Sequence, residues 1–404
     1  MTEAFCILIH YHEIALKGKN RSWFERRLIK NIKRQLSGLP FTKVQLNAAR
    51  IFCFGIDESM WNDYAQRLKK VMGIKHAILM TQVKDDIDTI KSVAAAQLKG
   101  LEFSSFRVSA RRQYKDFHLS SQEINIMVGQ HLQSTYLKPV KLKNADMDVV
   151  IELVKGMAYI GHERIYGFGG LPVKTSEQAI SMISSGIDSP VSSFEMLKRG
   201  VELTYIHFHS VPATSRQSIQ NVEEILTVLA GFQIQCRVYM VPLLEIQQKI
   251  MAVAPNKLWV ILFRRAMIKI ASMIAEQLDI PALISGESVG QVASQTLSNI
   301  RATADAADRP ILRPLAGLNK EDIIRIAEKI GTYEISIEPY DDCCSFFVPI
   351  HPETKADLEI VRKTEANIDF GEMFATALKD AEIKTFEHPD YVRKSINRLE
   401  KVSD

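Results

Sequence analysis

The chain of 404 residues is 46% hydrophobic and 24% charged, a balance that is typical of a multidomain globular protein and excludes a disordered or fibrous chain. Its net charge of +4 means that any surface that binds nucleic acid must be local. The sequence has no apolar run of the roughly 18 residues that a membrane span needs, no signal-peptide pattern, and five cysteines without a disulfide framework, so we expect a cytoplasmic protein with no membrane partner.

The N-terminal residues predict a small α+β domain over residues 1–59. Residues 5–12 alternate between apolar and polar side chains as in a strand, a helical pattern follows over residues 24–36, and residues 44–54 predict a returning strand. This domain is locally basic, because residues 14–34 contain a single acid and eight basic residues, which are Lys17, Lys19, Arg21, Arg26, Arg27, Lys30, Lys33 and Arg34.

A second domain is expected over residues 60–164, followed by a linker over residues 165–174. The pattern predicts helices at 60–71 and 121–136 and strands at 77–81, 106–110, 149–153 and 158–162. Ser120 or Ser121 is expected to cap the second helix. The linker contains Gly167-Phe-Gly-Gly-Leu-Pro172, and clustered glycines before a proline disfavour regular structure.

A third domain is expected over residues 175–404. The apolar runs 179–183 and 203–208 flank an amphipathic helix that ends before Gly200, which is the pattern of a β-α-β unit and implies a parallel sheet. The pattern also predicts buried strands at 238–241 and 282–284, a long helix at 257–277 and a helical tail.

The segment Ser184-Ser-Gly-Ile-Asp-Ser-Pro190 lies between the first of these strands and its helix. A turn in this place points backbone N–H groups and a helix N-terminus at one spot, which favours a bound phosphate. Asp188 would suit Mg²⁺ that bridges phosphates. A simple capped turn between a strand and a helix has the same pattern, so this segment alone does not show whether a phosphate binds here. Neither a Walker A nor a G-x-G-x-x-G motif is present.

Three basic residues of this domain call for an anionic partner. Arg264 and Arg265 lie midway in the long apolar helix, and a buried guanidinium needs an anionic partner, which an interdomain salt bridge would also provide. Lys320 lies in the first turn of a helix that follows Asn319. A positive charge in the first turn is unfavourable next to the helix dipole, so the lysine is expected to have a role there, namely to bind an anion. The alternative is an exposed lysine without a specific role.

The adjacent Cys343 and Cys344 cannot chelate zinc as a C-x-x-C motif does. One of them can carry a persulfide whose terminal sulfur attacks an activated carbon and whose bridging bond the second thiol opens. Two buried structural thiols are the alternative. His207 and His209 have no evident third ligand, so no metal site is predicted. The remaining cysteines are expected in the core: Cys6, Cys53 and Cys236.

The Ser-x-Gly-x-Asp-Ser loop resembles the PP-loop of ATP pyrophosphatases, which cleave ATP to AMP and pyrophosphate. Other segments narrow this resemblance, namely Lys17-Gly-Lys-Asn-Arg21, Ser109-Ala-Arg-Arg112, Gly169-Gly-Leu-Pro172, Ser285-Gly-Glu-Ser-Val-Gly-Gln-Val-Ala-Ser-Gln295 and Arg313-Pro-Leu315. In this order they are similar, over essentially the whole chain, to the tRNA 4-thiouridine synthetase (tRNA sulfurtransferase) family. The resemblance implies a ferredoxin-like domain, a THUMP domain for tRNA, and a doubly wound parallel-sheet PP-loop domain of the adenine nucleotide alpha hydrolase-like type.

The resemblance also implies roles for individual residues. The catalytic residues would be Asp188, Lys320, Cys343 and Cys344, of which Cys343 aligns best with the sulfur-accepting cysteine, while Cys344 stays open. The expected ATP-binding residues are Met182, Ile183, Ser184, Ser185, Gly186, Ser189, His207, Phe208, Arg264, Gly286 and Gln295. The expected tRNA-binding residues are Lys17, Lys19, Arg21, Arg107, Arg111, Arg112 and Lys115.

The implied reaction adenylates O4 of a uridine, at position 8 of the tRNA, and replaces this oxygen by persulfide sulfur to give 4-thiouridine. It needs ATP with transient Mg²⁺, tRNA, a cysteine desulfurase as persulfide donor and a reductant for the thiols, and a homodimer is compatible with it.

Two features depart from the family pattern. Ser185 stands where the loop normally has a glycine, and serine would cost roughly 1 kcal/mol if that position needs a positive φ. Some members carry a C-terminal rhodanese domain, which we do not expect here. A link to thiamine thiazole synthesis therefore stays open.

Three alternatives stay open beside this interpretation. A PP-loop ligase or amidotransferase would not need the adjacent thiols. A tRNA-binding or chaperone protein with a decayed loop would show no exchange of pyrophosphate into ATP. A THUMP-containing methyltransferase would need a glycine-rich cofactor motif that the sequence lacks.

Overall fold

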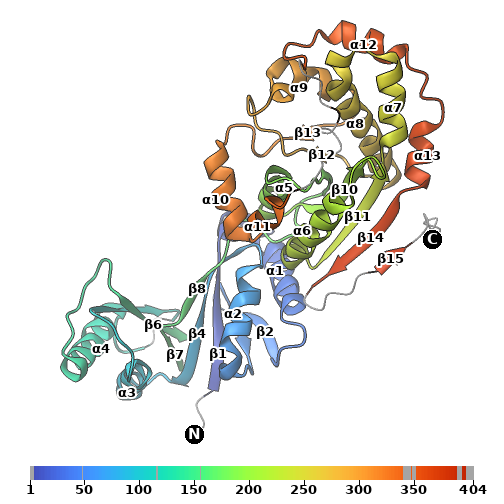
Figure 1. Cartoon of the computed structure of the whole chain (residues 1–404). Helices are drawn as coiled ribbons and strands as arrows, with labels where there is room; N and C mark the ends of the chain where they lie inside the picture. Colours follow the sequence, from blue (N-terminus) through green and yellow to red (C-terminus); the bar gives the residue numbers. More distant parts are fainter. Residues whose placement is uncertain are drawn as a thin grey trace. The chain divides into compact units, whose positions relative to one another are not determined.

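The computed structural model of the chain describes residues 4–47, 49–114, 117–154, 156–339, 347, 352–388 and 394–396. The chain forms two compact units, Met1–Pro172 and Val173–Asp404, and each unit has its own sheet (Figure 1). Among the described helices, none combines the length and the apolarity that crossing a lipid bilayer requires.

Unit 1 begins with the β-α-β-β-α-β order of a ferredoxin-like fold. Its elements are β1 (Ala4–Tyr11), the single-turn helices η1 (Glu13–Leu16) and η2 (Gly18–Asn20), α1 (Arg21–Gln35), β2 (Lys43–Asn47), β3 (Arg50–Phe54), η3 (Glu58–Met60), α2 (Trp61–Lys69) and β4 (Ile74–Lys84). The strands are hydrogen-bonded in the order β2-β3-β1-β4. Successive side chains of a strand point to opposite faces, so Ile7 and Ile9 pack on the face that α1 and α2 cover, whereas Cys6 and Leu8 lie on the other face.

The same sheet continues into the second half of unit 1. The elements of this half are α3 (Ile87–Leu98), β5 (Phe106–Arg112), α4 (Ser121–Tyr136), β6 (Met147–Val154), β7 (Met157–Gly161) and β8 (Arg164–Tyr166). Beyond β4 the strand order is β7-β6-β5, with β5 and β6 parallel. Ser120, and not Ser121, caps α4. Its hydroxyl accepts from the Glu123 N–H at 3.1 Å, and the Glu123 carboxylate accepts from the Ser120 N–H at 2.6 Å.

Unit 1 differs from the sequence pattern in three places. The single strand expected over residues 44–54 is a hairpin in which Asn47 pairs with Arg50, and Ala49 has a φ of 63°, the left-handed conformation of tight hairpin turns. The pattern also misses helix α3. Strand β4 is hydrogen-bonded to β1 on one side and to β7 on the other, so the sheet runs through the boundary that the sequence suggests at residue 59.

Unit 2 has a mainly parallel sheet. Its strands are β9 (Gln178–Met182), β10 (Glu202–His209), β11 (Gln235–Pro242), β12 (Leu283–Ile284), β13 (Ile311–Leu312), β14 (Glu382–Glu387) and β15 (Lys394–Ile396). They lie in the order β13-β12-β9-β10-β11-β14-β15, and the first five in this order are parallel. The order reverses at β9, which has β10 on one side and β12 on the other. Sheets of this type bind ligands at such a point, beyond the carboxyl ends of the strands.

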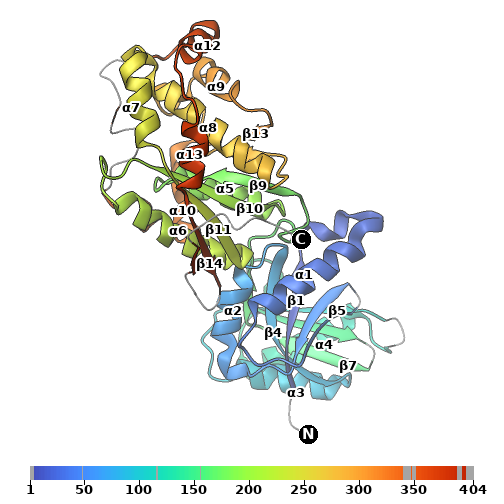
Figure 2. The same cartoon turned by 90° about the vertical axis from the view of Figure 1, so that its right-hand side faces the viewer.

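Helices cover both faces of this sheet (Figures 1 and 2). One face packs against α7 (Leu244–Val253), α8 (Trp259–Gln277), α9 (Leu297–Ala304), α12 (Leu358–Ala366) and α13 (Met373–Lys379). The other face packs against α5 (Asp188–Lys198) and α6 (Gln217–Gln233), which α10 (Lys320–Ile330) and α11 (Tyr333–Ser336) contact in turn. The short helices η4 (Asn256–Leu258) and η5 (Ala293–Gln295) complete the described helices of unit 2.

The C-terminal part of unit 2 differs from the purely helical tail that the sequence suggests. After α13 the chain returns as β14, which runs antiparallel to β11 with Gln235 opposite Glu387. Four successive residues of β14 are buried, from Ile383 to Phe386. Two of these residues, Lys384 and Thr385, are polar, so the segment has neither the apolar run nor the regular apolar–polar alternation that indicates a strand.

The sheet of unit 1 is strongly curled on the face opposite the helices. The rings of Phe52 on β3 and Tyr159 on β7 are 4.8 Å apart between centroids, although β1 and β4 lie between their strands. Arg50 Nε on β3 and Glu152 Oε1 on β6 are 3.0 Å apart. In a flat sheet these residues would be separated by about 14 Å or more. Glu152 is only 1% exposed, and its burial raises the pKa of its carboxyl group.

We therefore expect Arg50→Met to lower the free energy of unfolding of unit 1 by about 3 kcal/mol, because it leaves the buried Glu152 without its guanidinium partner. Lys91→Met, which removes a pair with the exposed Asp88, should cost less than about 1 kcal/mol. Urea unfolding of the fluorotryptophan-labelled chain, followed by fluorine NMR at Trp61, measures both effects. Equal, small effects of the two substitutions would show that the ion pair across the curled sheet does not stabilise it.

Candidate functional site

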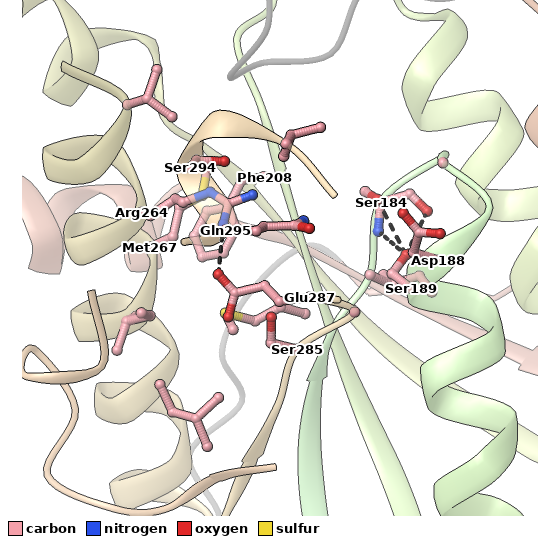
Figure 3. A pocket seen from close by; sticks show the side chains of 18 of the residues that line it. Ser184, Asp188, Ser189, Phe208, Arg264, Met267, Ser285, Glu287, Ser294 and Gln295 are labelled. Atoms are coloured by element: carbon pink, nitrogen blue, oxygen red, sulfur yellow. Dashed lines mark hydrogen bonds and ion pairs between the residues drawn. The ribbon is translucent and has the colours of Figure 1, made fainter. Parts of the chain in front are cut away.

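A pocket of about 520 Å³ lies in unit 2 where β9, β10 and β12 end. Its walls come from the loop after β9, the end of β10, helix α8 and the segment after β12 (Figure 3). The residues expected at a nucleotide site that line it are Met182, Ile183, Ser184, Gly186, Asp188, Ser189, His207, Phe208, Arg264, Gly286 and Gln295. The expected residue Ser185 is buried but is not part of the lining. The topology therefore gathers residues that lie more than a hundred positions apart in the sequence.

The loop between β9 and α5 is closed by its own serines. Ser189 Oγ accepts a hydrogen bond from the Ser184 N–H at 2.8 Å and donates to the Ser184 carbonyl at 3.1 Å. Helix α5 begins at Asp188, and the residue before it, Ile187, has no polar side chain that could cap the first turn. The N–H groups of this turn are thus available to an anion in the pocket.

The serine at position 185 causes no backbone strain. Neither Ser185 nor Gly186 is among the described residues with a positive φ, so the expected cost of placing serine in the loop does not arise. The glycine that the loop needs is Gly286, on the neighbouring segment. A Cβ atom at this position would lie 2.9 Å from both N and Cα of Ser189, which is closer than side chains tolerate. This contact brings the end of β12 against the start of α5.

Asp188 and Lys320 meet at the loop end of the pocket. Lys320 Nζ is 2.7 Å from Asp188 Oδ1, and Gln291 Nε2 donates to Asp188 Oδ2 at 2.9 Å. Lys320 is the first residue of α10, and Asn319 caps this helix by accepting from the Asp322 N–H. Lys320 therefore lies in a first turn, as expected, and its partner among the described residues is the carboxylate of Asp188.

Charged groups at the other end of the pocket form a second cluster. Glu287 lies between two guanidinium groups: Arg264 Nη1 is 2.6 Å from Glu287 Oε1, and Arg313 Nε is 2.7 Å from Glu287 Oε2. The neighbouring Arg265 points elsewhere and pairs with Asp305 and Glu365 inside unit 2. Arg265 therefore follows the salt-bridge alternative, whereas Arg264 lines the pocket and also pairs with Glu287.

His207 is held as a neutral ring below the loop. A carbonyl oxygen can only accept, so His207 Nδ1 donates to the Ile183 carbonyl at 3.0 Å, and Nε2 is left as an acceptor without a partner among the described residues. Burial lowers the pKa of His207 to about 4. The residue thus contributes shape and an acceptor to the pocket, but no charge at neutral pH.

The basic residues expected to contact tRNA lie in unit 1. Lys17, Lys19 and Arg21 lie in or between η1, η2 and the start of α1. Arg21 Nε donates to Glu25 at 2.8 Å, Lys17 Nζ lies 5.0 Å from the centre of the Phe24 ring, and Lys19 is exposed. Only part of this basic segment is therefore engaged within unit 1.

The second set of expected tRNA contacts lies on β5. Arg107 and Arg111 point to the face opposite the helices, whereas Arg112 points to the helix side and donates to a backbone carbonyl. Arg107 pairs with Asp148 at 2.6 Å, and Arg111 is exposed. Lys115 lies outside the described residues.

The two adjacent cysteines, Cys343 and Cys344, also lie outside the described residues. The three remaining cysteines are buried, as expected, and burial raises the pKa of Cys53 and Cys236 to about 12. Thiols with such pKa values are unreactive at neutral pH. Nucleophilic sulfur chemistry therefore cannot come from these three residues.

Sequence reasoning misses several residues that shape the pocket. Glu287, Gln291 and Arg313 stand within segments that carry the family resemblance, but the sequence gives none of them a role. Their partners are distant along the chain, so no local pattern indicates them. The apolar lining of α8, formed by Val260, Met267 and Ile268, has the pattern of any buried helix. Only the direction of the strands shows that this side of α8 faces a cavity.

Comparison with known proteins identifies related families for each part. Residues 174–370 match the family described as "Thiamine biosynthesis protein (ThiI)", residues 6–77 match the ThiI ferredoxin-like domain, and residues 84–163 match the THUMP domain. These matches and the two sheets confirm the expected combination of a ferredoxin-like fold, a THUMP domain and an α/β domain with a parallel sheet.

Similar proteins cover almost the entire chain. A probable tRNA sulfurtransferase from Thermus thermophilus is 38% identical over 96% of this chain and 95% of its own length. One from Moorella thermoacetica is 40% identical over 94% of this chain and 97% of its own length. The crystal structure of a 4-thiouridine synthetase–RNA complex with bound ATP aligns with a TM-score of 0.86 at 34% identity, and covers 95% of this chain and 100% of that one.

The low pKa of His207 makes the stability of unit 2 depend on pH. The unfolded chain protonates this residue near pH 6.5 and the folded chain only near pH 4, so the unfolded state binds more protons in between. Stability should therefore fall as the pH is lowered from 6.5 towards 4, by about 1.4 kcal/mol per pH unit from this group. His207→Gln should flatten this dependence, whereas substitution of the exposed His118 should not.

Urea unfolding at several pH values, followed by fluorine NMR of fluorotryptophan at Trp259, measures this slope in unit 2. An identical slope in the wild type and in His207→Gln would contradict the argument.

Proposed function

The chain belongs to the tRNA sulfurtransferase family, and on this basis we propose that it is a tRNA uracil 4-sulfurtransferase. It uses ATP to replace O4 of a uridine in tRNA, at position 8, by sulfur, and releases AMP and pyrophosphate. The observation that carries this proposal is the pocket of unit 2, which lies where the strand order of the sheet reverses at β9. The 184–189 loop and the Asp188–Lys320 pair lie at one end of this pocket.

The first chemical step activates an inert oxygen. O4 of uridine is a poor leaving group, because sulfur would have to expel oxide or hydroxide. Attack of O4 on the α-phosphorus of ATP forms a phosphoester to AMP and breaks the bond to pyrophosphate. The N–H groups at the start of α5 and the ammonium group of Lys320 are placed to hold the departing pyrophosphate.

Mg²⁺ fits this site through Asp188. The usual Mg²⁺ site in nucleotide enzymes combines one or two carboxylates with substrate phosphates and water, and Asp188 is the carboxylate at the loop end of the lining. The bound ion would supply charge neutralisation to the phosphates. Gln291 holds the same carboxylate by its second oxygen, which fixes its orientation.

The second step delivers sulfur from the adjacent cysteines. We assign the persulfide to Cys343, loaded by a cysteine desulfurase. Its terminal sulfur attacks C4, and AMP leaves with O4. The thiolate of Cys344 then attacks the sulfur of Cys343, which releases 4-thiouridine and leaves a disulfide between the two cysteines. A two-electron reductant returns both thiols for the next turnover.

Unit 1 supplies the contact with tRNA in this proposal. The exposed Lys19 and Arg111 suit phosphate contacts, which position an RNA without reading its bases. Structured RNA is recognised mainly by its shape, so phosphate contacts from unit 1 can suffice to bind and position a tRNA. The protein would act in the cytoplasm, where tRNA is modified.

Removal of the sulfur-carrying residue tests the proposal in cells. In a strain that lacks the gene, we expect 4-thiouridine to be absent from bulk tRNA and to return with the wild-type gene or with Cys53→Ala, a change to a buried thiol of unit 1. Cys343→Ser should give no 4-thiouridine but retain tRNA-dependent exchange of pyrophosphate into ATP. Mass spectrometry of tRNA nucleosides measures the first result.

Three outcomes would contradict the proposal. Normal 4-thiouridine in the strain that lacks the gene would favour another PP-loop enzyme, such as a ligase or amidotransferase. Normal 4-thiouridine in the Cys343→Ser, Cys344→Ser double variant would show that the sulfur does not pass through these cysteines. Absence of pyrophosphate exchange in the wild type, with and without tRNA, would favour a binding protein that does no chemistry.

The loop geometry predicts a second result. Gly286→Ala places a Cβ atom against the backbone of Ser189, so the start of α5 has to move, and we expect ATP affinity to fall at least about tenfold. Gly317→Ala is the matched control, because a Cβ atom there meets nothing within 4 Å. Calorimetric titration with ATP and Mg²⁺ measures both. An unchanged affinity of Gly286→Ala for ATP would show that ATP binding does not depend on the geometry of this loop.

A further inference from the structure

Glu287 is an unusual residue for a pocket that takes a polyanion. Its side chain lines the pocket, and the residue is only 7% exposed. Arg264 and Arg313 neutralise it from opposite sides, one at each carboxylate oxygen. Phosphate would be bound better by the two guanidinium groups without a carboxylate between them. A carboxylate in this place suits a part of the ligand that donates hydrogen bonds.

The position of Glu287 indicates which part that is. Gly286 packs on the backbone of Ser189, so Glu287 follows directly on the phosphate end of the pocket. The far wall is apolar and carries Phe208 and Met267, which suit a purine ring. In the view of Figure 3, Glu287 lies between the labelled loop residues and Arg264. In a nucleotide the ribose lies between the phosphates and the base.

We infer that Glu287 accepts a hydrogen bond from a ribose hydroxyl of ATP and thereby selects ribonucleotides against deoxyribonucleotides. Each carboxylate oxygen has two lone pairs, and each uses one for an arginine, so each can accept one further hydrogen bond. The arginines fix both the charge and the direction of the carboxylate. Hydrogen bonds to a charged acceptor discriminate strongly, because an analogue without the hydroxyl leaves the buried acceptor unsatisfied. This inference rests on the proposed use of ATP.

The competing explanation is that Glu287 only holds Arg264 in place. Both explanations predict weaker nucleotide binding when the carboxylate is removed. They differ in selectivity. A residue that only holds Arg264 affects ATP and its deoxy analogues equally, whereas a residue that binds the ribose affects only nucleotides that carry the hydroxyl.

Calorimetric titration with ATP, 2′-deoxy-ATP and 3′-deoxy-ATP in the presence of Mg²⁺ tests the inference. The wild type should bind at least one deoxy analogue about tenfold more weakly than ATP, which corresponds to about 1.4 kcal/mol. In Glu287→Ala this ratio should fall to about one. Glu276→Gln is the matched control, because it alters a carboxylate that also pairs with an arginine in unit 2 but is 80% exposed, and it should keep the wild-type ratio.

The possible outcomes separate the inference from the proposed function. Equal affinity of the wild type for all three nucleotides overturns the inference. This measurement needs no variant, so the inference can be tested even if Glu287→Ala does not fold. An unchanged ratio in Glu287→Ala shows that the residue only holds Arg264. No binding of ATP to the wild type overturns the proposed function itself.

Discussion

The approach of Gly286 to the backbone of Ser189 is the contact on which the rest of the site depends. It joins the end of β12 to the start of α5, beside the strand β9 at which the sheet order reverses, at a distance that leaves no room for a Cβ atom. Ser192 strengthens the same contact from the helix side by donating to the Ser285 carbonyl at 3.0 Å. The start of α5 and the carboxylate of Glu287 are therefore held rigidly relative to each other, and a ligand that touched both would be bound at two points of fixed separation.

Within this rigid arrangement, the two charged clusters have different strengths. Lys320 is 42% exposed, so its pair with Asp188 contributes little to stability and can be exchanged for a phosphate at small cost. In the cluster of Arg264, Glu287 and Arg313, the carboxylate is buried and the two arginines are partly buried, so removal of both arginines would leave the charge of Glu287 uncompensated. If the pocket binds ATP as proposed, the ion pair at the phosphate end can be exchanged, whereas the cluster around Glu287 stays in place when pyrophosphate leaves.

A feature of this site can be predicted from the sequence when the residues that form it are close together along the chain. The loop from Ser184 to Pro190, its strand and its helix are contiguous, so a short pattern identifies them. Lys320 is identified by its unfavourable place in a helix dipole. The helix pattern alone does not distinguish Arg264 from Arg265, because adjacent helix positions differ by about 100° in direction and the pattern does not fix which of them faces the cavity, so only the family resemblance selects Arg264. Gln291 lies 103 residues from its partner Asp188, a pairing that only the strand order establishes.

Unit 1 shows the same dependence on long-range contacts. Each half has its own core on the helix side, which explains why its pattern suggests two domains. The halves nevertheless share β4, and the curl of the sheet adds a second link, because Arg50 of one half pairs with the buried Glu152 of the other. The basic residues near α1 and those on β5 consequently belong to one body. A partner recognised by its shape requires charges at fixed spacing, and two halves joined by a flexible linker could not provide it.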